Sequence, residues 1–127
     1  MIYQSNEELQ QACEYWQKKL RLQDWIVKAS IRREKELKNR EVAGECEWNL
    51  HKKMASVRIL DPIDYPDDLM TDHDMEWTLV HELLHLHFAP IGRDSDENQE
   101  ILIEQAIDSI AWGIVNLSRQ NKELKEG

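Results

Sequence analysis

The chain has 127 residues, of which 41% are hydrophobic and five are tryptophan, so it is long enough to bury one core and short enough to form one domain. Its formal net charge of −9 disfavours general nucleic-acid binding, which needs lysine and arginine to displace counterions from phosphates. No run approaches the roughly 18 apolar residues of a membrane span. The N-terminal residues M-I-Y-Q-S-N-E-E also lack the regions of a signal peptide. We therefore expect a single cytoplasmic domain over residues 1–127, without a membrane partner.

Charge is divided unevenly along the chain. Residues 28–40 hold six basic and two acidic side chains, whereas residues 61–108 hold fourteen acidic side chains and a single basic one, Arg93. The acidic half would attract cations, either metal ions or basic segments of a partner. The two cysteines, Cys13 and Cys46, lie far apart without C-x-x-C spacing. We expect reduced thiols, although spacing alone leaves both open as metal ligands.

The first half of the chain changes from helical to strand periodicity. A capping-box pattern followed by apolar residues at helical spacing predicts an amphipathic helix over residues 6–22. Alternating apolar and polar residues then predict half-buried strands over residues 25–33, 41–49 and 54–61. Because the links between these strands are short and polar, we expect an antiparallel meander.

The second half of the chain predicts a loop and two helices. Prolines and carboxylates mark residues 62–69 as a loop. Thr71 or Asp72 can cap the next helix, which should end at Ala89-Pro90 with Gly92 following. A last helix is expected from about residue 96 to residue 118. The order of elements predicts an α+β fold.

The run T-L-V-H-E-L-L-H-L-H-F at residues 78–88 places histidines and a glutamate in an apolar helix, where bare polar groups cost several kcal/mol each. His81 and His85 lie one turn apart on the helix, about 40° apart around its axis, so both imidazoles can converge on one point. Glu82 is on the adjoining face. This is the H-E-x-x-H pattern, in which two imidazoles bind a metal and the carboxylate takes a proton from water. His87 falls roughly 140° away and is expected to be structural or partly exposed.

A third metal ligand has to be a carboxylate, because no histidine follows His87. Glu104 is the candidate, since it lies inside the apolar run I-L-I-E-Q-A-I-D-S-I-A, with Asp108 one turn later on the same face. We expect both carboxylates to be buried, with Glu104 on the metal and Asp108 accepting the free ring N–H of His81 or His85. Glu97 and Glu100 share roughly this face, and either could be the ligand if the helix register differs.

These two motifs carry a family resemblance. H-E-L-L-H at residues 81–85 followed by E-Q-A-I-D at residues 104–108 resembles the signature of the gluzincin metallopeptidases. The chain is similar to the minimal members called minigluzincins and to small metallopeptidases encoded by phages and prophages. The outline covers residues 1–118, but only the two motifs are specific. ImmA/IrrE-like and SprT-like proteins also carry H-E-x-x-H in compact chains.

The resemblance implies a minimal zincin-like fold with an N-terminal helix, a small, largely antiparallel three-stranded sheet, an active-site helix and a C-terminal glutamate helix. It also implies a zinc ion (Zn2+) held by His81, His85 and Glu104, with Glu82 as the general base. Residues 54–61 would form the sheet edge that binds an extended substrate.

The residue that would stabilise the oxyanion has no motif of its own. Tyr65, His73 and His51 are candidates by residue type alone.

Two functions remain from the sequence. One is a zinc-dependent metallopeptidase acting on a peptide or protein substrate, which an intact Glu82 favours. The alternative is a catalytically weak or latent binding module that uses a metal-stabilised zincin fold to hold a protein partner. A weaker third reading gives the basic residues 28–40 a nucleic-acid role, with binding that salt would abolish.

Overall fold

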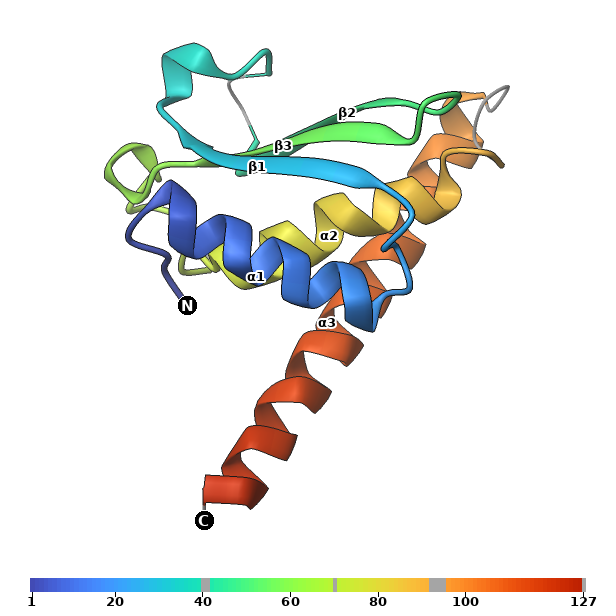
Figure 1. The fold of residues 1–127 in the computed structure, drawn as a ribbon. Helices are drawn as coiled ribbons and strands as arrows, with labels where there is room; N and C mark the ends of the chain where they lie inside the picture. The colour runs from blue at the N-terminus through green and yellow to red at the C-terminus, as the bar shows by residue number, and fades with distance from the viewer. Residues whose placement is uncertain (40–41, 70, 92–95, 127) are drawn as a thin grey trace.

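The structure is a computed structural model that describes residues 1–39, 42–69, 71–91 and 96–126. The described part is α+β: helices α1, α2 and α3 accompany a three-stranded mixed sheet of β1, β2 and β3. Helices α1 and α2 lie against one side of the sheet, and the C-terminal end of α3 projects beyond the body (Figure 1). The bounds are α1 Asn6–Lys19, β1 Ile26–Arg32, β2 Gly44–Asn49, β3 Met54–Leu60, α2 Met75–Phe88 and α3 Glu97–Glu126.

The strands occur where the sequence predicts them, but their order differs from a meander. The sheet has the order β1-β3-β2, in which β3 pairs with β2 antiparallel and with β1 in parallel. The expectation of a largely antiparallel sheet is therefore wrong for β1. Strand β3 carries Val57 and Ile59, which have no exposed surface, and the central position buries these side chains. Apolar burial thus favours β3 over β2 as the middle strand.

The C-terminal ends of two helices differ from the prediction. Helix α1 ends at Lys19 rather than near residue 22, because Arg21 has a φ of 62° and Leu22 N bonds back to Gln17 O at 2.7 Å. Such a left-handed residue is a common way for a helix to end. Helix α3 extends past residue 118 to Glu126.

The cap of α2 was also predicted wrongly. Neither Thr71 nor Asp72 caps this helix; Asp74 does, and its Oδ1 accepts a hydrogen bond from Trp77 N at 3.1 Å. Helix α2 ends at Phe88, one residue before Ala89-Pro90. Gly92, which was expected to follow that end, lies outside the described residues.

A single cluster of buried side chains joins the helices to the sheet. Apolar burial of this kind stabilises a protein by about 1.5–3 kcal/mol for each large side chain. Within the described residues, no helix is long and apolar enough to cross a membrane. Fully or almost fully buried members of the cluster include Leu9, Cys13, Trp16, Val57, Ile59, Leu79, Leu83, Ile107, Ala111 and Val115.

The outer edge of β1 is closed by side chains of α1. Ile31 N donates to Asn6 Oδ1 at 2.7 Å, and Ala29 N donates to Gln10 Oε1 at 2.8 Å. Gln10 Nε2 in turn donates to Val27 O at 3.0 Å. These amides satisfy backbone groups that would otherwise be open to a further strand. Strand β2, which lies beside α2, forms the opposite edge of the sheet.

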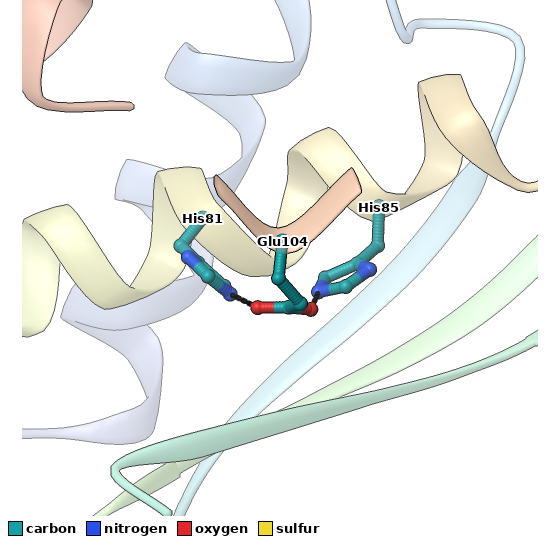
Figure 2. A group of neighbouring side chains, drawn as sticks. All are labelled: His81, His85 and Glu104. Carbon is teal, nitrogen blue, oxygen red and sulfur yellow. Dashed lines mark ion pairs between the residues drawn. The ribbon is translucent and has the colours of Figure 1, made fainter. Parts of the chain in front are cut away.

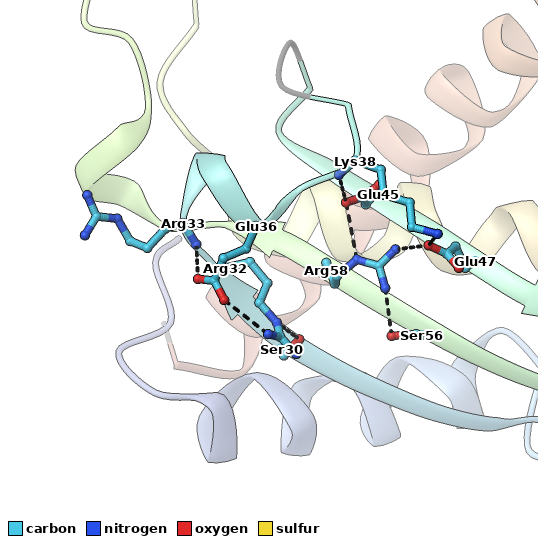
Figure 3. Close-up of polar contacts among 9 residues, drawn as sticks. All are labelled: Ser30, Arg32, Arg33, Glu36, Lys38, Glu45, Glu47, Ser56 and Arg58. Carbon is cyan, nitrogen blue, oxygen red and sulfur yellow. Dashed lines mark hydrogen bonds and ion pairs between the residues drawn. The ribbon is translucent and has the colours of Figure 1, made fainter.

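The face of the sheet turned away from the helices is polar, as the alternation of residues predicts. Figure 3 shows Arg58 at the centre of this face, donating to Glu45 Oε1 at 3.2 Å and to Ser56 Oγ at 3.3 Å. Arg33 from the basic stretch makes a bidentate pair with Asp64, at 2.7 and 3.0 Å. Such pairs reduce the positive charge that residues 28–40 could offer to a phosphate.

Candidate metal centre

Helix α2 supplies the first two groups of the centre. It packs under the sheet and buries Leu79, Val80, Leu83 and Leu84, so its orientation is fixed by apolar contacts. His81 and His85 are one turn apart, and their side chains are only 12% and 20% exposed. Their ring centroids are 5.2 Å apart. Burial lowers the pKa of His85, which favours the neutral imidazole that binds metals.

Helix α3 brings a carboxylate between the two rings. Glu104 Oε2 lies 3.2 Å from His81 Nε2, and Glu104 Oε1 lies 2.8 Å from His85 Nε2 (Figure 2). One potential ligand atom from each of these residues falls within 4.8 Å of the others. Tetrahedral zinc, with ligand distances near 2.1 Å, separates its ligands by about 3.4 Å, so the three groups fit this ion after a small adjustment.

The position of Glu104 distinguishes it from the other carboxylates considered. Glu97 and Glu100 lie on exposed turns at the start of α3 and do not join the group formed by the described residues. The expectation of buried carboxylates is wrong, since the side chains of Glu104 and Asp108 are 48% and 50% exposed. The site is thus open to solvent on the α3 side.

Asp108 lies against the other nitrogen of the first histidine. Its Oδ1 is 2.8 Å from His81 Nδ1. That nitrogen is buried and has no aligned hydrogen bond, so the carboxylate approaches it off the N–H axis. An imidazole whose second nitrogen faces a carboxylate is a common arrangement around metal-binding histidines.

Two tryptophans flank the histidines. The Trp77 ring is tilted by 46° to His81, with centroids 5.2 Å apart, while Trp48 from β2 stacks on His85 at 6.1 Å. Trp77 also stacks on Trp112 of α3 at 5.1 Å. These rings restrict the orientations of both imidazoles and were not singled out from the sequence, where aromatic residues at such spacing indicate core packing.

Glu82 follows His81 on helix α2 and is only 6% exposed. Its Oε1 is 3.9 Å from His81 Nε2. Burial, together with the negative charges of Glu104 and Glu45, raises the pKa of Glu82 to about 8. A cation bound by the two histidines would act in the opposite direction and favour the ionised carboxylate.

These groups line a pocket of about 490 Å³ between strand β2 and helix α2. Its wall on the strand side was missed in the sequence, because the edge position of a strand leaves no local signal. A glycine in place of an apolar residue in the 41–49 alternation is the one available hint. The lining includes Val42, Ala43, Gly44, Cys46, Trp48, Trp77, Thr78, His81, Glu82, His85 and Glu104.

Several other candidates lie away from the centre. His87 is exposed, and its Nε2 lies 2.6 Å from Leu20 O, as expected of a structural residue. Tyr65 stacks on His73 and donates to Thr71 O, and His51 is exposed; none of these three lines the pocket.

The structure also locates the two cysteines and corrects the strand expected to form the substrate edge. Cys13 is fully buried and Cys46 lines the pocket, and neither belongs to the metal-binding group found among the described residues. Met54–Leu60 is the central strand β3, not an edge, so the expectation of a substrate edge at residues 54–61 is wrong. The edge beside the pocket is β2.

Comparisons with known proteins add no family to this geometry. No protein-family model matches the chain, and no curated protein or solved structure shows significant similarity to it.

Proposed function

We propose that the protein is a zinc-dependent metallopeptidase of the gluzincin type, with a minimal zincin-like fold. The observation that carries this proposal is the convergence of His81 Nε2, His85 Nε2 and the Glu104 carboxylate beside a buried glutamate in a pocket. Structural zinc sites usually close all positions with protein ligands, often cysteine, and need no adjacent carboxylate. Three ligands with an adjacent Glu82 fit a catalytic site better.

The residues of the chain would divide the work as follows. His81, His85 and Glu104 would hold the ion, and Asp108 would orient the His81 ring. A bound zinc ion would supply Lewis acidity, which polarises a peptide carbonyl and acidifies water. Glu82 would remove a proton from the attacking water and deliver it to the leaving amine nitrogen.

Strand β2 is the part of the pocket suited to an extended peptide. Ala43 O accepts a hydrogen bond from Leu60 N of β3 at 2.8 Å. Because hydrogen-bonded and non-bonded pairs alternate in an antiparallel ladder, the backbone groups of Gly44, Cys46 and Trp48 point away from β3. A substrate strand could pair with these groups, whereas the β1 edge is closed by α1.

A second function is favoured by one observation. None of the three residues considered as oxyanion donors lines the pocket. A latent binding module would use the same metal centre and the same β2 edge to hold a protein segment without hydrolysing it.

Metal content of the purified, untagged protein tests the centre. Elemental analysis should find about one zinc per chain in the wild type and in Glu97→Ala, a matched control on the same helix. Glu104→Ala should lose most of it, because it removes one of three ligands. Retention of zinc in Glu104→Ala together with its loss in Glu97→Ala would contradict the proposed ligand set.

Hydrolysis of fluorescein-labelled casein then separates the two functions. Glu82→Gln should keep its zinc and lose hydrolysis, since the amide cannot accept the proton. Hydrolysis that survives in Glu82→Gln would refute the role of this residue. Zinc-loaded wild type that binds casein without cleaving it would support the binding module instead.

A further inference from the structure

Gly44 of β2 lies close against helix α2. A β-carbon placed on it would lie 2.6 Å from Thr78 Cγ2 and 3.5 Å from Glu82 Cγ. The first distance is about 1 Å short of the optimum for two carbon atoms. Only a residue without a side chain therefore allows β2 to lie this near to α2, at the turn that carries Glu82.

Thr78 cannot readily give way to a larger residue. It is 4% exposed, and its Oγ1 donates to Asp74 O at 3.0 Å. A β-branched side chain in a helix has few rotamers, and rotation of this one would break that hydrogen bond. On the strand side, the added β-carbon would also lie 3.3 Å from Arg58 O of β3. Backbone on one side and a fixed methyl group on the other leave movement of β2 as the available response.

We propose that Gly44 is a positioning residue that sets the distance between the edge of β2 and Glu82. The outward backbone groups of Gly44 and Cys46 are where an extended substrate would pair, so this spacing determines how far the scissile carbonyl lies from the carboxylate. The role in substrate placement rests on the proposed peptidase function. The spacing itself follows from the Gly44 and Thr78 contact and can be measured without any substrate.

The chain offers a matched pair of glycines for the test. Gly44→Ala adds a methyl group against Thr78, whereas Gly113→Ala adds the same group on α3, where nothing lies within 4 Å. The double variant Gly44→Ala with Thr78→Ser removes the obstructing Cγ2 and keeps the hydroxyl that bonds to Asp74. Thr78→Ser alone is the reference for that double variant.

Two readouts are measured on zinc-loaded protein. The first is the rate at which iodoacetamide alkylates Cys46, followed by peptide mass spectrometry. The Cys46 thiol is partly covered between strand β2 and helix α2. Cys13 is fully buried and serves as an internal control. The second is cleavage of labelled casein.

We expect Gly44→Ala to keep its zinc, to be alkylated faster at Cys46 and to lose casein cleavage by about 100-fold, the effect of a misplacement near 1 Å. Gly113→Ala should match the wild type in both readouts. The double variant should return towards Thr78→Ser alone.

Several results would overturn the proposal. Unchanged Cys46 alkylation in Gly44→Ala would mean that β2 does not move. Faster alkylation with unchanged cleavage would mean that the spacing does not place the substrate. A double variant that behaves like Gly44→Ala, or fails to fold as shown by circular dichroism, would mean that the Thr78 methyl group is not the obstacle. A wild type that cleaves no casein would refute the proposed substrate role together with the peptidase function, while the alkylation rates would still decide the spacing.

Discussion

Replacement of Arg119 by methionine should destabilise the protein far more than an ordinary surface substitution. This arginine of α3 reaches the start of α2, where Nη2 lies 2.9 Å from both Asp74 oxygens and Nε lies 3.1 Å from Glu76 Oε1. Glu76 is only 4% exposed, and its other oxygen accepts one hydrogen bond from Trp16 Nε1 at 3.4 Å. Without the guanidinium, Glu76 would be a buried carboxylate with one long hydrogen bond.

The magnitude follows from the exposure of the partners. Removing one member of a buried ion pair costs about 3–5 kcal/mol, because it leaves an uncompensated charge. The Arg119 side chain is 34% exposed, so water can reach part of the vacated space, and we expect the lower end, about 3 kcal/mol. For a chain of this length, that loss corresponds to a fall in Tm of about 10 °C.

Urea unfolding followed by far-ultraviolet circular dichroism measures this loss. Arg32→Met is the control, because Arg32 and Glu36 form an exposed i,i+4 pair worth less than about 0.5 kcal/mol. Adding Glu76→Gln to Arg119→Met should recover part of the stability, since it removes the stranded charge. A loss below about 1 kcal/mol in Arg119→Met, or no recovery in the double variant, would refute the assignment of a buried ion pair.

Two smaller predictions concern the carboxylates of Asp108 and Asp64. Asp108→Ala should weaken zinc binding by about 10- to 100-fold, as the loss of a carboxylate partner of a metal-binding histidine does. Competition with a chelating dye measures this affinity, and an unchanged affinity would mean that Asp108 does not support the His81 ring. For Asp64, the hydrogen bonds from Arg33 and Glu34 N hold the pKa at about 2, below the ordinary 3.8. This carboxylate therefore stabilises the fold above pH 3.8, and that contribution is lost as the pH falls towards 2. The difference in urea midpoint between wild type and Asp64→Asn should shrink accordingly from pH 6 to pH 3; a constant difference would contradict the pairing.

The sequence predicted the two-helix part of the site because a helix has a fixed period. His81 and His85 had to lie on one side of α2 whatever the tertiary structure. The position of Glu104 required only that α3 turn its apolar residues towards α2, which the buried Ile107 and Ala111 achieve. Periodicity could not predict how deeply Glu104 is buried. Its side chain is half-exposed because it lies near the start of α3, where few other residues cover the helix.

The wall of the pocket formed by the sheet could not be predicted in the same way. Alternation identifies which residues of a strand share a face, but it does not identify the neighbour of that strand. Short links suggested that β1 pairs with β2, whereas burial of Val57 and Ile59 places β3 between them. The alternation therefore cannot show that β2, and not the residues 54–61 that the family resemblance implies, is the edge beside the histidines, and it gives no separate role to Gly44.

The two helices of the centre differ in how firmly they are held, and this bears on how a metal would bind. Helix α2 lies within the core, so His81 and His85 are preorganised by apolar packing before any ion arrives. Glu104 precedes Ile107, the first fully buried residue of α3, and its own turn contacts the core through the partly buried Ile103. An ion would therefore meet two fixed imidazoles and a third ligand, Glu104, on a half-exposed turn, and part of its binding energy would go into holding that turn. The same arrangement would make zinc binding stabilise the start of α3 more than the rest of the protein.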